Sequence, residues 1–126
     1  MKEVMDEFTG KKRHLRLADL IKEEISRMLI KGLKDPRVDM VNITHVKVSG
    51  DLRFGKVYFR VSKTSYDIRE VMKGLKSASA FIKRELLKAL GIKFVPELEF
   101  LYDNSLEYAE HMEKIFAKIR GDSAEE

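Results

Sequence analysis

Residues 41–62 read VNITHVKVSGDLRFGKVYFRVS, and they carry the clearest structural pattern of the chain. Its first part is rich in β-branched residues, and apolar residues alternate with polar ones in its second part, as in a half-buried strand. Ser49-Gly50-Asp51 between the two parts has turn chemistry. The stretch therefore predicts a β-hairpin with strands at about 41–49 and 54–62.

The first of these strands departs from a strict period of two. Val41 and Ile43 would share one face of an ideal strand, whereas Val46 and Val48 would share the other. A β-bulge adds one residue to a strand and so reverses the side to which later residues point. We therefore expect a bulge near Thr44-His45.

Helical periodicity precedes and follows the hairpin. Before it, apolar residues recur at intervals of three and four over about 15–33, and Asp35-Pro36 ends this helix because the residue before proline is disfavoured in helical conformation. After it, an N-cap at Thr64 starts a helical pattern that continues to Gly91. Small residues at 77–80 interrupt this pattern, so we expect two helices or one kinked helix.

The remaining segment predicts a third strand and a last helix. Pro96 lies within an apolar-alternating run at about 93–102, and since proline cannot donate to a ladder, this strand should lie at a sheet edge. Asp103-Asn104-Ser105 then caps a helix that Gly121 ends. The order αββααβ plus a C-terminal helix predicts an α+β fold, with helices on one face of a three-stranded mixed sheet.

The chain of 126 residues suffices for one domain with one core. We place this domain at 13–120, between a flexible N-terminal tail at 1–12 and a disordered C-terminal tail at 121–126. The sequence has no cysteine, which excludes disulfides and thiolate metal sites. No apolar run approaches the roughly 20 residues that span a bilayer, and the first residues lack the apolar centre of a signal peptide. We therefore expect a cytoplasmic protein without a membrane partner.

Catalytic motifs are not found. Residues 50–57, GDLRFGKV, nearly match a phosphate-binding P-loop, but Val57 replaces the hydroxyl residue that binds magnesium, and a strand follows instead of a helix. His14, His45 and His111 lie in three different predicted elements without a second ligand at metal-binding spacing. We expect no catalytic residue, no metal and no cofactor, and therefore a protein that is not an enzyme.

The charges are strongly segregated along the chain. Residues 11–37 contain nine Lys/Arg against four Asp/Glu, residues 69–93 seven against two, and residues 97–126 three against nine. A basic surface beside an acidic one is typical of proteins that bind polyanions. Two solvated helix faces would give the same composition, so both interpretations remain open at this level.

The positions of the basic residues favour nucleic-acid binding. Five cations of the first helix fall within roughly 60° of one another on an ideal helical wheel: Arg13, Arg16, Arg27, Lys31 and Lys34. A second group surrounds an aromatic residue near the interrupted helix: Lys76, Phe81, Lys83, Arg84 and Lys88, with Arg37 and Arg53 at loop ends. An exposed phenyl ring among cations can stack on single-stranded bases, although Phe81 could instead pack beneath a neighbouring helix.

Several short motifs follow one another in a characteristic order: Asp35-Pro36-Arg37, Val46-Lys47-Val48-Ser49, Lys56-Val57-Tyr58-Phe59, Val95-Pro96-Glu97-Leu98-Glu99-Phe100 and Tyr102-Asp103-Asn104-Ser105. Their joint order and spacing resemble the ribosome-binding factor A family over about residues 13–119. The resemblance implies a single type II KH-like domain. It also implies an Ala-x-Gly helix kink, which corresponds to Ala78, Ser79 and Ala80, with alanine in place of the glycine.

The resemblance implies a function as well. Members of the family are similar in role to assembly factors: they bind the free 30S subunit and its 16S rRNA, assist late 30S maturation and 16S rRNA processing, and support growth in the cold. We accordingly expect a monomeric RNA-binding protein that could also contact other assembly factors. The alternative is a protein–protein interaction module that acts through the acidic C-terminal helix.

Overall fold

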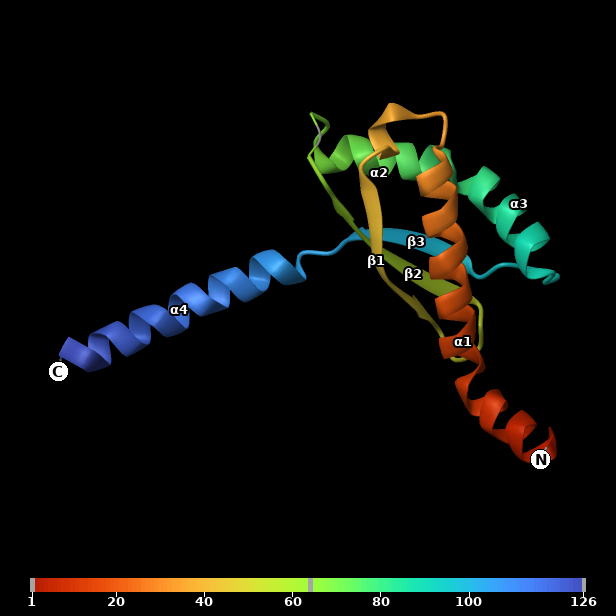
Figure 1. Ribbon diagram of the computed structural model, residues 1–126, viewed down its shortest axis with the longest axis horizontal. Helices are drawn as coiled ribbons and strands as arrows, with labels where there is room; N and C mark the ends of the chain where they lie inside the picture. Colours follow the sequence, from red (N-terminus) through yellow and green to blue (C-terminus); the bar gives the residue numbers. More distant parts are fainter. Residues whose placement is uncertain (1, 64, 126) are drawn as a thin grey trace.

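The computed structural model describes the backbone of residues 2–63 and 65–125 and the side chains of residues 12–63 and 65–121. Its elements are α1 (Lys2–Lys31), the 3₁₀ turn η1 (Pro36–Val38), β1 (Val41–Val48), β2 (Phe54–Val61), α2 (Ile68–Ser77), α3 (Ser79–Leu90), β3 (Glu97–Tyr102) and α4 (Ser105–Glu125). The predicted α+β order is confirmed (Figure 1). The helices α1 and α4 are longer than expected, because they continue through 2–12 and 121–125, which we had assigned to tails.

The three strands form one mixed sheet in the order β1-β2-β3. The strands β1 and β2 pair antiparallel as the predicted hairpin, and β3 lies parallel to β2 at the edge of the sheet. The register shifts between Ile43 and His45, which confirms the expected bulge. Because of this extra residue, Val46 and Val48 are buried on the same side as Val41 and Ile43.

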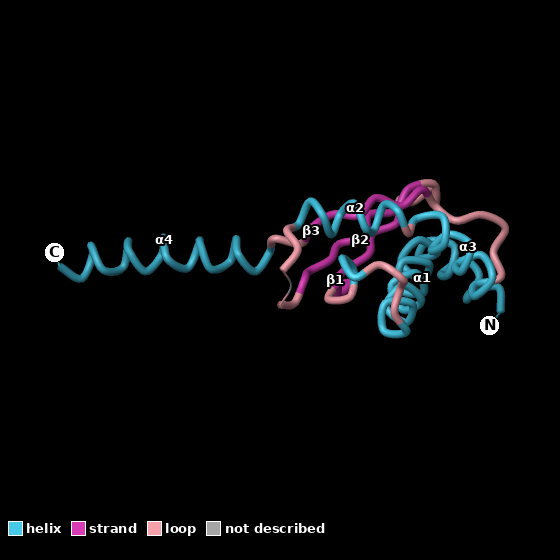
Figure 2. The backbone as a smooth tube through the Cα atoms, turned by 90° about the horizontal axis from the view of Figure 1, so that it is seen from above, coloured by secondary structure: helices cyan, strands magenta, loops and turns pink. Residues whose placement is uncertain are grey.

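One hydrophobic core joins the sheet to the first three helices. Ile21 and Ile25 of α1, Leu75 of α2 and Leu86 of α3 are fully buried, together with Phe59 of the central strand. The burial of strand residues alternates, which leaves the face of the sheet opposite the core exposed to solvent. In both backbone views α1 and α3 lie side by side (Figures 1 and 2).

The ends of the helices are capped by specific residues. The helix α2 begins at Ile68, where the carboxylate of Asp67 accepts a hydrogen bond of 2.9 Å from the backbone N–H of Glu70. The expected cap at Thr64 lies outside the described residues. The helix α3 ends as predicted at Gly91, whose φ of 62° places it in the left-handed region that glycine adopts easily.

The last helix, α4, extends away from the rest of the protein like an arm (Figure 2). Two residues separate it from β3, and the two chain termini lie at opposite ends of the molecule (Figure 1). Among the described residues, no helix combines the length and the apolar character that crossing a membrane would require.

Candidate nucleic-acid interface

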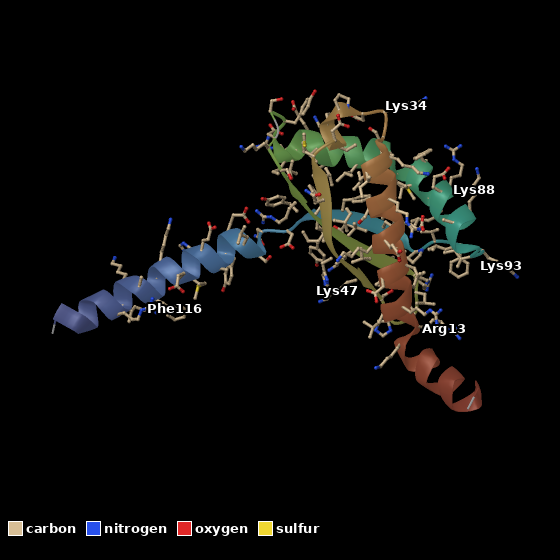
Figure 3. The ribbon with its side chains drawn as sticks, in the orientation of Figure 1. Arg13, Lys34, Lys47, Lys88, Lys93 and Phe116 are labelled. Atoms are coloured by element: carbon tan, nitrogen blue, oxygen red, sulfur yellow. The ribbon has the colours of Figure 1, made fainter. Side chains whose placement is uncertain are left out.

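The basic residues of α1 form a line along the helix. Arg13, Arg16 and Lys31 are exposed, and Lys34 is exposed in the loop that follows the helix. Figure 3 shows Arg13 beside the lower part of α1 and Lys34 just beyond its upper end. The predicted stripe therefore runs along α1 from Arg13 to Lys31, and Lys34 extends it into the loop.

Arg27 differs from the other cations of this stripe. Its guanidinium donates to Glu23 Oε1 at 2.7 Å and also pairs with Glu24. These two carboxylates balance the charge of Arg27 locally, so its long-range attraction for an anion is reduced. Of the five predicted residues, Arg27 is the one whose contribution to phosphate binding should be smallest.

Phe81 lies beside the end of α1, on the first turn of α3. Its side chain is 42% exposed, and it borders two adjoining hollows of about 420 and 300 Å³. Lys34 lines the first hollow and Lys31 the second. The structure thus brings an accessible phenyl ring next to two lysines from a segment about fifty residues away in sequence. This is the chemistry required to stack a base and hold its phosphates.

The other predicted cations of α3 continue this surface. Arg84 and Lys88 are exposed, and Figure 3 shows Lys88 pointing outward from the helix. Lys83 lies on a different side of α3, where it lines a hollow of about 630 Å³ together with Arg53 from the end of the hairpin turn. The helix α3 therefore separates two basic regions instead of belonging to a single groove.

A further groove lies between α2 and the edge strand β3. Its volume is about 830 Å³, and Lys56, Lys73 and the predicted residue Lys76 line it. Phe54 borders both this groove and the hollow near Arg53, and it is 55% exposed. Both cavities therefore combine cations with an accessible aromatic ring.

Four residues that line these two cavities were not predicted from the sequence: Phe54, Lys56, Lys73 and Phe94. Phe94 is 67% exposed and lines the hollow near Arg53, and Figure 3 shows Lys93 at the far end of α3. The pair Lys93-Phe94 contained a usable signal. Lysine is rarely buried, so an aromatic residue directly beside a lysine can be expected near the surface. The predicted strand starts at about Lys93, whereas β3 begins only at Glu97 and leaves both residues in the preceding loop.

Arg37 has a structural role in the loop after α1. Its Nε and Nη2 atoms donate to both carboxylate oxygens of Asp35, with an Nη2–Oδ2 distance of 2.6 Å. The side-chain hydrogen bonds from Arg37 lower the pKa of Asp35, which also caps the 3₁₀ turn. Both side chains are partly covered, so this ion pair fixes the loop more than it offers a charge to a ligand.

Comparison with known proteins identifies the family of this chain. A family model described as Ribosome-binding factor A matches residues 13–116. The chain belongs to the ribosome-binding factor A family. Ribosome-binding factor A of Citrifermentans bemidjiense is 44% identical to it over 108 residues, which are 86% of this chain and 91% of that protein.

Solved structures of ribosome-binding factor A support the same fold. The crystal structure of ribosome-binding factor A from Thermus thermophilus matches with a TM-score of 0.65 at 21% identity, over 73% of this chain and 97% of that one. A second similar structure is a model of Thermus thermophilus ribosome-binding factor A fitted into the cryo-EM map of its complex with the 30S subunit. It matches with a TM-score of 0.52 at 22% identity, over 68% of this chain and 93% of that chain. The αββααβ order is consistent with the expected type II KH-like fold.

The helix kink forms in this member of the ribosome-binding factor A family without glycine. The helices α2 and α3 meet at Ala78, whose ψ of −5° departs from the helical value, and α3 resumes at Ser79. The hydroxyl of Ser79 donates to the carbonyl of Leu75 at 3.2 Å, a bond that bends helices. Ala80, which replaces the expected glycine, lies after the interruption and is exposed.

Proposed function

We propose that this protein is a non-catalytic assembly factor that binds the free 30S ribosomal subunit through its 16S rRNA. The observation that carries this proposal is the surface made by Phe81 with Lys31 and Lys34 of one segment and Arg84 and Lys88 of another. Membership of the ribosome-binding factor A family, and the 30S complex of the Thermus thermophilus protein, support the small subunit as the partner.

The binding would combine two physical contributions. The exposed lysines and arginines would displace counterions from RNA phosphates, which gives affinity without much sequence preference. Phe81 would stack on an unpaired base and thereby select single-stranded segments over duplex RNA. Such a protein needs no covalent chemistry. It binds one RNA conformer more tightly than the others and thereby shifts the RNA toward that conformer.

The salt dependence of binding tests this proposal. Reversing Arg16 and Lys34 to glutamate should flatten the dependence of the association constant on salt, because each lost phosphate contact reduces the slope by roughly 0.7 to 0.9. The matched control reverses Lys114 and Lys118 of α4, which changes the net charge by the same amount far from Phe81. An unchanged slope in the α1 variant would exclude α1 from the interface.

The alternative function uses α4 as the contact with ribosomal or assembly proteins. It is supported by the large apolar side chains that α4 exposes, such as Phe116 and Ile119. The α1 and α4 charge-reversal variants also distinguish RNA binding from this alternative. If only the α4 variant loses binding to the 30S subunit, the protein-interaction module is favoured.

We further propose that the protein acts in the cytoplasm during late 30S maturation and 16S rRNA processing, and that it supports growth in the cold. Misfolded RNA persists longer at low temperature, so a conformer-selecting protein matters most there. A deletion strain should grow slowly in the cold and accumulate unprocessed 16S precursor. Normal processing in that strain would refute this part of the proposal and leave RNA binding itself unaffected.

A further inference from the structure

The hollow of about 630 Å³ near the start of β3 is bordered by two exposed aromatic rings. Phe54 is 55% exposed and Phe94 67% exposed, and neither ring contacts another aromatic ring in the described part of the chain. The buried residues Val95 and Phe100 also line this hollow, so its floor is apolar. An apolar patch with a polar rim is typical of ligand-binding grooves.

Positive side chains surround this hollow and the groove that adjoins it between α2 and β3. Five cations line the two cavities: Arg53, Lys56, Lys73, Lys76 and Lys83. Among the described residues, none of these five forms an ion pair. Glu97 and Glu99 lie in the same walls, and Asp51 lies beside Arg53 in the hairpin turn. The cations outnumber these three acids, so the surface attracts phosphates.

Hydrogen bonds fix the backbone on both sides of the hollow. The N–H of Phe54 donates to Ser49 Oγ at 3.0 Å, which holds this residue against the hairpin turn. The N–H of Glu97 donates to the carbonyl of Arg53 at 2.9 Å, and this bond joins the end of the hairpin to the segment that carries Phe94. A cavity whose walls are already in place loses little conformational entropy when a ligand binds.

This hollow and the surface around Phe81 lie on different sides of α3. At 100° per residue, the side chains of Phe81 and Lys83 leave the helix about 160° apart. Lys83 lines the hollow with Phe54, and no residue that lines this hollow also lines either hollow beside Phe81. An RNA segment stacked on Phe81 therefore leaves the rings of Phe54 and Phe94 accessible.

We propose that the hollow with Phe54 and Phe94 is a second site for unpaired RNA, and that the protein holds two RNA segments at once, one on each side of α3. A base would stack on one of the two rings, while Arg53 and Lys83 would hold the adjoining phosphates. This inference rests on the proposed function, because the first segment is the one bound at Phe81. Holding two segments raises the effective concentration of one for the other, which favours contacts between distant parts of an RNA.

The number of sites can be counted with an unstructured oligouridylate of about six nucleotides, a length suited to a single site. Native mass spectrometry of the full chain should show two RNA molecules on one protein. In a fluorescence titration, Phe81→Leu should lower the affinity of one site about tenfold, and Phe54→Leu combined with Phe94→Leu should do the same at the other site. If this double variant does not fold, Phe94→Leu alone provides the test, since Phe94 is the more exposed ring.

Tyr108→Leu supplies the matched control. It removes a ring of α4 that is 64% exposed and borders neither RNA surface, so both affinities should stay unchanged. One RNA per protein, weakened only by Phe81→Leu, would overturn this inference and leave the proposed function intact. One RNA weakened only by the Phe54 and Phe94 variants would overturn both. One RNA weakened by both sets would mean that a single strand crosses α3, which also overturns the two-segment proposal.

Energy transfer between donor-labelled and acceptor-labelled copies of the same RNA tests whether the two segments come together. The signal should rise while RNA is in excess and fall again when protein is in excess, because each RNA then binds a separate protein. Phe81→Leu and the Phe54 and Phe94 variants should each reduce the signal, whereas Tyr108→Leu should not. A signal that all these leucine variants preserve would indicate bridging by charge alone and overturn the proposal.

Discussion

Replacing Phe81 with leucine separates the contribution of its ring to RNA binding from its contribution to stability. The ring is 42% exposed, so more than half of it is covered by neighbouring atoms. A buried phenylalanine covers on the order of 200 Å², which gives a covered area of roughly 110 Å² here. At about 25 cal/mol per Å², truncation to alanine would cost about 3 kcal/mol of folding free energy, so a loss of stability could not be told apart from a loss of RNA contacts.

Leucine keeps most of the buried contact and removes the flat aromatic face. Phe81→Leu should therefore lower the free energy of unfolding by less than about 1.5 kcal/mol. Stacking of one base on an aromatic ring is worth about 1 to 3 kcal/mol, so the affinity for single-stranded RNA should fall about tenfold. Urea unfolding measures the first quantity, and fluorescence anisotropy with a labelled single-stranded RNA at fixed salt measures the second.

The neighbouring residue Ile82 supplies the matched control. It is fully buried on the same turn of α3, and Ile82→Val should cost about 0.5 to 1.5 kcal/mol without changing the surface. If Ile82→Val and Phe81→Leu weaken RNA binding equally, the loss reflects a loosened α3 and the stacking role of Phe81 is refuted.

Three further predictions concern the core and the arm. Leu86→Ala should lower the free energy of unfolding by about 2 to 5 kcal/mol in urea denaturation, because Leu86 is fully buried. Gly74→Ala should also destabilise the protein, by about 1 kcal/mol in the same assay, since the new Cβ would lie 2.9 Å from Val38 Cγ1 in the packed core. Hydrogen bonds lower the pKa of Asp103 and of Glu107 to about 2. The contribution of these two carboxylates to holding α4 is therefore complete above about pH 5 and is lost as the pH falls toward 2. NMR should show the start of α4 loosening over that range, and an unchanged spectrum would contradict this prediction.

The fold could be predicted from the sequence because its signals are local. The alternation in the hairpin, the parity change that revealed the bulge and Gly91 at the end of α3 each depend on a few adjacent residues. The bounds of α1 and α4 were harder to predict. Both helices continue into charged segments with weak apolar periodicity, where no proline or cap marks an end.

The candidate site was predictable only in part, because it depends on distances between segments. The helical wheel placed Arg27 on the basic side of α1, but it could not show that Glu23 and Glu24 form ion pairs with this arginine. Likewise, Lys83 and Phe81 are two residues apart in sequence, yet they face different hollows. Only the packing of α3 against α1 decides which cations lie beside the aromatic ring.

Whether a cation is already paired with a carboxylate bears on how reversibly the protein binds RNA. Arg27, Arg37, Arg60 and Arg120 each form an ion pair with a nearby carboxylate, as suits a planar guanidinium that binds two oxygens at once. Among the described residues, no ion pair is formed by any of the lysines that surround Phe81 and α3: Lys31, Lys34, Lys83 and Lys88. A lysine is a flexible point charge that contacts phosphates without fixed geometry. In the described part of the chain, Arg84 on the same surface forms no ion pair either. Beside Phe81 the unpaired lysines outnumber this arginine, and such a surface favours rapid, salt-sensitive attachment and release.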